Sequence, residues 1–210
     1  MALGHRAVEA AVVSSIFAAL GTIAVALRLW TRLVIIRAPG IEDAIIVASW
    51  MCAVVTVITI GMQIVHGLGE HVSTLSGDDT TQLLFNFYIS ISTYCASIGL
   101  TKTAILVQYL RVFPTRTFQI WCWAFIFIVV AYTIATVFAC IFVCIPVQSF
   151  WNGDPNGKCI NELASWFSNA AINIVTDLMI IVLPMPVIKN LNLARRQKKL
   201  LMGIFAFGGM

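Results

Sequence analysis

Apolar runs long enough to cross a lipid bilayer dominate the chain, and short polar segments separate them. A membrane-spanning helix needs about 20 predominantly apolar residues, and the stretches between charged side chains reach this length five times. We expect spanning helices at residues 8–30, 44–65, 82–109, 118–142 and 163–188, with an incomplete sixth at 200–210. A spanning barrel would need alternating segments of about 10 residues, and the pattern shows none.

These runs predict an all-α fold, a polytopic transmembrane helical bundle in which residues 1–210 form a single transmembrane domain. In lipid, every backbone N–H and C=O group has to bond within the protein, and helices meet this requirement segment by segment. The first run lacks a short apolar core followed by a small-residue cleavage site, so we expect it to act as a signal anchor. Because the sixth run is half a span, we expect the functional protein to be longer.

Composition agrees with a lipid environment. The 210 residues are 60% hydrophobic and 10% charged, and the mean hydropathy is +0.94, whereas soluble domains carry about 25% charged residues. A cytosolic enzyme, a disordered chain and a coiled coil do not fit this composition. The net charge of +4 is small and scattered, so we expect the lipid bilayer as a partner and no nucleic acid.

The positions of Lys and Arg predict the orientation, because short inner loops are enriched in these residues. With the N-terminus outside, the inner segments hold ten of the thirteen: Arg28, Arg32, Arg37, Arg111, Arg116, Lys189, Arg195, Arg196, Lys198 and Lys199. The outer segments hold Arg6 and Lys158, and Lys102 lies in the membrane. We expect the basic loop that runs from Lys189 to Lys199 to be cytoplasmic, where it attracts anionic lipid or a signalling partner.

Several short motifs follow one another in a fixed order. They are Arg28-Leu29-Trp30-Thr31-Arg32, Glu42-Asp43, His66 to His71, Tyr109-Leu110-Arg111, Cys144-Ile145-Pro146 with Cys159, and Leu183-Pro184-Met185-Pro186. Together they resemble the fungal rhodopsin-domain integral membrane family, which includes Pth11-like receptor candidates, over essentially the whole chain. The resemblance implies a rhodopsin-like, seven-helix architecture, of which about five and a half helices are present, and a receptor-like role. Glu42-Asp43 departs from the commoner Asp-Asp pair and keeps its charge.

Two charged residues, Lys102 and Asp177, fall inside predicted spans. A charge at the bilayer centre costs about 2.5–3.5 kcal/mol on insertion scales, so such residues normally face the bundle interior. At a rise of about 1.5 Å per residue, Lys102 lies roughly 13 Å above Arg111 and Asp177 roughly 18 Å above Lys189. We therefore expect an ion pair between the third and fifth spans. The alternative is that Lys102 reaches towards the inner headgroups and Asp177 is protonated.

Further polar residues extend from this pair along both helices. Asn169, Asn173 and Asp177 recur every four residues and share a helix face, and the third span has a stripe of its own. That stripe consists of Ser90, Tyr94, Ser97 and Thr101. The candidate site is Lys102, Asp177, Asn173, Asn169, Tyr94 and Ser97. It is either a hydrogen-bonded seam between helices or a cavity for an unknown small-molecule ligand, and the two are compatible.

The outer loops contain two more candidate sites. His66 and His71 are separated by glycines and share no helix face. Two histidines are also fewer than the three or four ligands of a zinc site. We expect a polar turn with no metal and no cofactor, and copper or zinc binding is the alternative. Cys144 and Cys159 are the expected disulfide in the second outer loop, where oxidation is permitted. Cys140 lies deeper, and sequence alone does not fix the connectivity.

Two functional classes stay open. The preferred one is a receptor-like protein that senses an extracellular ligand through the polar inter-helix cavity, in the plasma membrane as the resemblance implies. The alternative is a membrane-embedded enzyme or transporter that serves a secondary-metabolite pathway, since Lys102 and Asp177 could supply acid–base groups. No residue is assigned a catalytic role. A retinal-binding protein does not fit, because no acid stands between Asp79 and Asp154.

Overall fold

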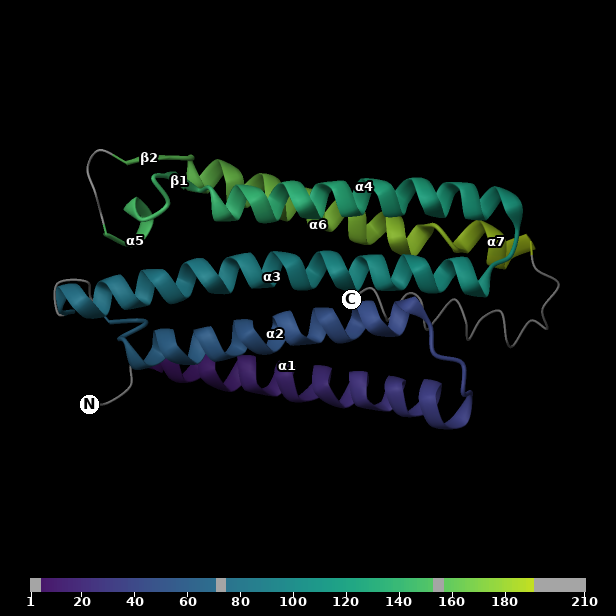
Figure 1. Cartoon of the computed structure of the whole chain (residues 1–210), viewed down its shortest axis with the longest axis horizontal. Helices are drawn as coiled ribbons and strands as arrows, with labels where there is room; N and C mark the ends of the chain where they lie inside the picture. Colours follow the sequence, from purple (N-terminus) through teal and green to yellow (C-terminus); the bar gives the residue numbers. More distant parts are fainter. Residues whose placement is uncertain (1–4, 71–74, 153–156, 191–210) are drawn as a thin grey trace.

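The long helices of the described residues run side by side along the long axis of the molecule (Figure 1). The computed structural model describes residues 5–70, 75–152 and 157–190. The long helices are α1 (His5–Trp30), α2 (Ile41–Val65), α3 (Gly77–Val112), α4 (Arg116–Ile141) and α6 (Glu162–Val182). The short elements are the π-helix η1 (Thr31–Ile35), β1 (Cys144–Ile145), α5 (Ser149–Asn152), β2 (Lys158–Cys159) and α7 (Met185–Asn190).

Within the described residues, five helical segments are long and apolar enough to cross a membrane, by length and composition. They are Ala7–Ile35, Ile41–Val65, Gly77–Val112, Arg116–Ile141 and Leu163–Val187. Their large apolar side chains are widely exposed, with Phe127 of α4 at 75% and Ile120 at 66%, as expected for surfaces that contact acyl chains. These features confirm the predicted all-α transmembrane bundle. The expected sixth helix lies outside the described residues.

The α2–α3 interface is held largely by hydroxyl groups. The Ser49 hydroxyl lies 2.6 Å from the Thr101 hydroxyl, and the Ser97 hydroxyl donates to the Ser49 carbonyl at 3.0 Å. Two turns further along α2, the Thr56 hydroxyl lies 2.8 Å from the Thr93 hydroxyl of α3. Small hydroxylated residues let two helices approach closely and bond across the interface inside lipid.

The α3–α4 interface is apolar near the connection between these two helices and very close at its centre. The buried apolar core consists of Leu106, Tyr109, Phe113, Phe118, Cys122, Ile126, Val129 and Ile180. Nearer the middle, a Cβ atom at Gly99 would overlap the Thr133 side chain. Because glycine has no side chain, the backbone of α3 at Gly99 can lie directly against the Thr133 side chain of α4.

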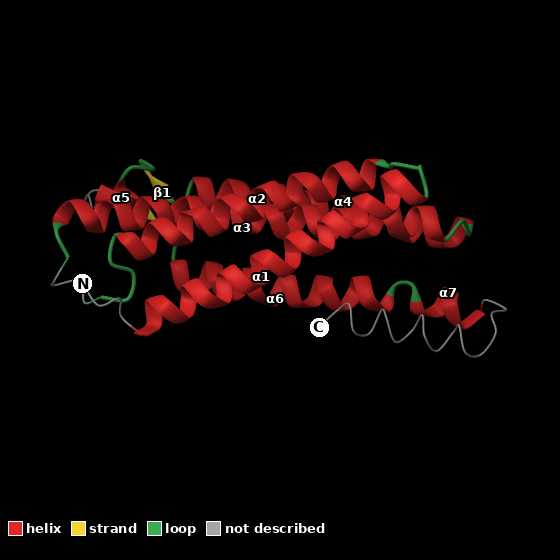
Figure 2. Ribbon diagram, turned by 90° about the horizontal axis from the view of Figure 1, so that it is seen from below, coloured by secondary structure: helices red, strands yellow, loops and turns green. Residues whose placement is uncertain are grey.

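The loops expected to be inner and those expected to be outer lie at opposite ends of the bundle, and the two ends are called inner and outer after this expectation. Figure 1 shows α5, β1, β2 and the start of α3 at one end, and the α1–α2 connection, the α3–α4 connection and α7 at the other. Seen from below in Figure 2, α6 and α7 follow each other along one side of the molecule. Helix α6 ends at Val182, before Pro184, which has no N–H group to continue the helix.

Candidate functional site

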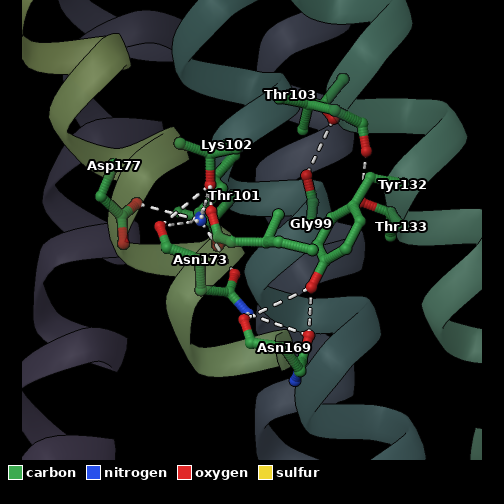
Figure 3. Close-up of polar contacts among 12 residues, drawn as sticks. Gly99, Thr101, Lys102, Thr103, Tyr132, Thr133, Asn169, Asn173 and Asp177 are labelled. Atoms are coloured by element: carbon green, nitrogen blue, oxygen red, sulfur yellow. Dashed lines mark hydrogen bonds and ion pairs between the residues drawn. The ribbon is translucent and has the colours of Figure 1, made fainter. Parts of the chain in front are cut away.

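The centre of the site is Lys102, a buried ammonium on α3 (Figure 3). The residue is 6% exposed, and its Nζ donates to three atoms of α6. These are the Asn173 carbonyl at 3.0 Å, Asn173 Oδ1 at 2.9 Å and Thr176 Oγ1 at 2.7 Å. Since a buried charge is stable only when it is paired and hydrogen-bonded, α6 supplies a complete acceptor set for this cation.

Asp177 supplies the opposite charge. Its Oδ1 lies 3.2 Å from Lys102 Nζ, and the two side chains are 55% and 7% exposed, respectively. The structure therefore brings together the two residues expected to pair. The ammonium is enclosed, whereas the carboxylate lies at the edge of the site with much of its surface uncovered.

Asn169 and Asn173 connect this pair to α4. Asn173 Nδ2 donates to the Asn169 carbonyl at 3.0 Å and to Asn169 Oδ1 at 3.1 Å. The Tyr132 hydroxyl of α4 donates to Asn169 Oδ1. The network thus joins α3, α4 and α6 along two turns of α6 (Figure 3), and residues from three helices fix the rotamers of the two amides.

A groove of about 460 Å³ opens between α3 and α6 beside the ion pair. Its polar lining comes from Asp177, Asn173, Asn169 and Tyr94, and its apolar lining comes from Phe87, Ile91, Ile98, Trp166 and Ile174. The volume falls in the range of about 300–1,000 Å³ that is typical of small-molecule sites, which combine apolar walls with a few polar groups. A smaller cavity of about 70 Å³ lies next to the groove and shares four lining residues with it, Ile91, Cys95, Trp166 and Asn169.

The structure places two of the expected site residues away from the ion pair. Ser97 bonds to Ser49 of α2 and does not line the groove. Tyr94 lies in the groove wall and is 54% exposed. The polar stripe of α3 therefore serves two neighbours: Ser90, Ser97 and Thr101 face α2, while Tyr94 faces the groove beside α6.

Thr176 and Tyr132 belong to the network although neither is among the residues expected from the sequence, and both could have been found there. Thr176 accepts the shortest hydrogen bond of Lys102, and it stands three residues after Asn173, the other spacing that shares a helix face. Tyr132 is the only tyrosine in the uncharged stretch from Thr117 to Gly153. A buried tyrosine hydroxyl needs a partner, so a polar contact from α4 could be inferred.

A second cluster of charges lies at the inner end, around the start of α2. Glu42 and Asp43 are buried, at 4% and 5% exposed. Arg111 Nη1 lies 2.7 Å from Glu42 Oε1, Arg28 Nε lies 3.2 Å from Asp43 Oδ1, and Arg32 Nη2 lies 3.4 Å from Glu42 Oε1. The two acids therefore join the inner ends of α1, α2 and α3.

The local backbone fits these acids closely. Asp43 Oδ2 accepts from the Gly40 N–H at 3.0 Å, which caps the start of α2, and a Cβ atom at Gly40 would overlap the Glu42 carboxylate. Arg28 Nη1 also donates to Gln108 Oε1 of α3 at 2.7 Å. The motifs that contain Arg28, Glu42 and Arg111 are visible in the sequence, but nothing in their spacing predicts that they meet.

The outer end is closed by a disulfide and a group of aromatic rings. Cys144 and Cys159 are bonded, and they face each other in the antiparallel pair of β1 and β2. Trp151 of α5 packs edge-on against Phe85 and Tyr88 of α3, with ring centroids 5.3 and 5.5 Å apart. The disulfide hairpin and α5 thereby hold the second outer loop against α3.

The remaining candidates are placed only in part. His66 Nδ1 lies 3.2 Å from Asp79 Oδ1, a contact that joins the end of α2 to the first turn of α3. His71 lies outside the described residues, and within the described part no group of three or more metal-ligating side chains is found. Of the basic loop, Lys189 lies in α7, and Arg195, Arg196, Lys198 and Lys199 lie outside the described residues.

Curated relatives come from filamentous fungi. The chain is 29% identical over 202 residues to the polyenoic acids biosynthesis gene cluster protein Ba17b of Metarhizium anisopliae, covering 93% of this chain and 55% of that protein. It is 32% identical over 177 residues to a SAT4 family membrane protein of Emericella nidulans, covering 83% and 44%. It is 26% identical over 207 residues to the receptor GIN3 of Arthrobotrys oligospora, covering 93% and 48%.

The chain spans about half the length of these relatives. No solved structure matches it significantly. The sequence model of the fungal rhodopsin domain matches residues 27–210, a range that contains the ion pair, the groove, the disulfide and the inner charge cluster. The chain therefore belongs to the fungal rhodopsin domain family of multi-pass membrane proteins.

Proposed function

We propose that this protein is receptor-like and senses a small-molecule ligand through the groove between α3 and α6. The observation that carries the proposal is the arrangement of Asp177, whose carboxylate is held at the groove wall by the buried Lys102 at 3.2 Å. The hydrogen bonds of Lys102, Asn173 and Asn169 fix its position, and fixed polar groups in an apolar groove give a binding site its specificity. The similarity to the receptor GIN3 supports this class.

The proposal places the N-terminus outside, in the plasma membrane, with residues 1–210 within one transmembrane domain. Arg28, Arg32 and Arg111 gather at the end of the bundle opposite the disulfide, as basic residues on the cytoplasmic side would. Disulfides form and persist in oxidising compartments, which supports an outer position for Cys144 and Cys159. A glycosylation acceptor site inserted beside Lys158 tests the orientation: modification supports it, and modification only of an acceptor beside Arg116 contradicts it.

Signalling in this proposal passes through the inner charge cluster. Helix α3 carries Lys102 in the membrane and Arg111 at its inner end, where Arg111 contacts Glu42 of α2. A movement of α3 relative to α6 on ligand binding would change the position of Arg111, whose side chain is 42% exposed. This exposed guanidinium and the basic loop are the surfaces that a cytoplasmic signalling partner would contact.

A matched pair of substitutions on α6 tests the proposal. Ala170 lines the groove and Ala171 does not, so Ala170→Trp should fill the groove, while Ala171→Trp adds the same bulk outside it. In the fungal host, the full-length Ala170→Trp protein should lose its transcriptional response to fractionated extracellular metabolites, and Ala171→Trp should keep it. Equal responses from both variants, at equal surface expression, would contradict ligand sensing through the groove.

The second candidate function is an enzyme or transporter of a secondary-metabolite pathway. The name of the Metarhizium anisopliae relative, a polyenoic acids biosynthesis gene cluster protein, favours it. Under this alternative, Ala170→Trp would remove or redirect a metabolite while the transcripts of the pathway genes stay constant. Metabolite profiles and transcript levels from the same cultures separate the two functions.

A further inference from the structure

In the ion pair, the donor hydrogens of Lys102 all have acceptors, whereas the carboxylate of Asp177 has acceptor capacity left over. Lys102 has three donor hydrogens and meets acceptors on Asn173, Thr176 and Asp177. The Asp177 carboxylate has two oxygens with about four lone-pair sites, and among the described residues its one partner is Lys102. The unused capacity at the Asp177 end of the groove is therefore an acceptor, so a group that binds to Asp177 has to be a donor.

The net charge of the pair restricts which donor fits. Lys102 and Asp177 sum to zero, so a cationic donor would add an uncompensated charge within the membrane, and Lys102 would repel it. A carboxylate would be repelled by Asp177 and would meet no free donor on Lys102. A hydroxyl group donates to the carboxylate without adding charge, and charges added within a bilayer are costly.

The walls of the groove fit an apolar body. Ile174 and Ile98 lie beside the polar end, and Phe87 and Trp166 line the outer end with ring centroids 6.2 Å apart in an edge-to-face arrangement. From Trp166 to Asp177 the groove follows α6 over eleven residues, roughly 16 Å at the rise of an α-helix. A ligand of this shape is elongated and apolar, with its polar group at the deeper end.

We infer that the groove binds a neutral amphipathic alcohol whose hydroxyl donates to Asp177 Oδ2 and whose apolar body lies along Ile174 and Trp166. The inference rests on the proposed function and adds the chemical class of the ligand. It also separates this ligand from an ionised carboxylic acid of the same length, because a carboxylate offers Asp177 an acceptor in place of a donor.

Photoaffinity labelling of the full-length protein in phosphatidylcholine nanodiscs tests the inference. The probes are three diazirine-bearing analogues, of decanol, decylamine and decanoic acid, and mass spectrometry identifies the labelled peptides. We expect the alcohol probe to label peptides of α3 and α6, with decanol competing about tenfold better than decanoic acid or decylamine at equal mole fraction in lipid. A hydrogen bond to a charged group accounts for a ratio of this order.

Two controls separate the ligand class from the site. Labelling by the alcohol should be lost in Ala170→Trp and kept in Ala171→Trp. In the double variant Lys102→Met/Asp177→Leu, which leaves no unpaired charge, the groove should still be labelled but without preference among the head groups.

The outcomes are distinguishable. If the acid or amine probe labels the groove as well as the alcohol or better, the inference about the ligand class is wrong and the groove remains a binding site. If none of the three probes labels α3 and α6, or if Ala170→Trp is labelled like Ala171→Trp, both the inference and the groove as a ligand site are overturned.

Discussion

Arg111 Nη1 on α3 donates to Glu42 Oε1 on α2 at 2.7 Å, and the two residues are 69 positions apart in the sequence. Glu42 is 5% exposed in this contact and Arg111 is 42% exposed. The buried carboxylate also lies 3.4 Å from Arg32 Nη2. Glu42 is thus the shared anion of two arginines from different helices.

Glu42→Gln should therefore destabilise the inner end of the bundle. The substitution removes the anion that pairs with Arg111 and the closer of the two acids beside Arg32, while it keeps the size of the side chain. We expect a loss of about 1–3 kcal/mol. Thermal unfolding of the detergent-purified protein measures it. Glu70→Gln, at an exposed position after α2, is the matched control and should leave the unfolding temperature unchanged. Equal unfolding temperatures for both variants would contradict this role of Glu42.

A double-mutant cycle tests the contact between Lys102 and Asp177. Lys102→Met leaves the carboxylate without its cation, and Asp177→Leu leaves the buried ammonium without its anion, so each single variant should be less stable than the wild type. The double variant should be more stable than the sum of the two losses predicts, with a coupling energy of about 1–3 kcal/mol. A coupling energy of zero would show that the two residues act independently.

Exchange of the two charges is a weaker test of the same contact. Lys102 meets acceptor atoms of Asn173 and Thr176 in addition to Asp177. An aspartate at position 102 would face those acceptors with a negative charge. We therefore expect the swapped protein to express poorly even though the wild-type residues are in contact, which is why the neutral cycle is preferred.

Gly99→Ala should disturb the packing of α4 on α3. The added Cβ would overlap the side chain of Thr133, and relief of that overlap requires a shift of one helix. We expect a loss of about 1–3 kcal/mol, the usual cost of overpacking, measured by thermal unfolding. Gly61→Ala on α2 is the control, because a Cβ there meets nothing within 4 Å. A similar effect of both substitutions would indicate that the close approach at Gly99 has no energetic importance.

Removal of the outer disulfide should loosen the second outer loop. Cys144 and Cys159 are 15 residues apart, and a cross-link that closes a loop of this size stabilises a fold by about 3 kcal/mol in the chain-entropy model. We expect Cys159→Ser and Cys144→Ser to lower the unfolding temperature equally. Reducing agent should lower the unfolding temperature of the wild type but not of these two variants. Cys52→Ser, at a free cysteine, is the control. Unchanged unfolding of the two loop variants would show that the bond adds no stability.

Sequence reasoning predicts the spanning helices well because the requirement for apolar length acts on each helix separately. The ends are less predictable. The first helix continues through a π-helical turn to Ile35, and the third extends to Gly77 and Val112. Ser76 accepts a hydrogen bond from the Asp79 N–H at the start of α3, so capping chemistry begins this helix beyond its apolar run.

The site is predicted only where depth and face determine the contact. Lys102 and Asp177 lie at similar depths on helices that face each other. Their depths, calculated from the rise per residue of a helix, are therefore sufficient to predict the contact. Ser97 shows the limit of this kind of prediction. The spacing of polar residues in α3 shows which of them share a face with Ser97, but it does not show that this face contacts α2. The contacts of Tyr132 and of Glu42 depend on how neighbouring helices rotate about their axes, which the sequence of one helix does not contain.

The space around Gly40 gives the α1–α2 loop control over a distant helix. A methyl group at this position would displace the carboxylate of Glu42 and so release the guanidinium of Arg111. The hydrogen atom that Gly40 has in place of a side chain therefore affects the position of the inner end of α3. The absence of a side chain at Gly40 thus helps to fix the position of a helix that is long enough to cross the bilayer.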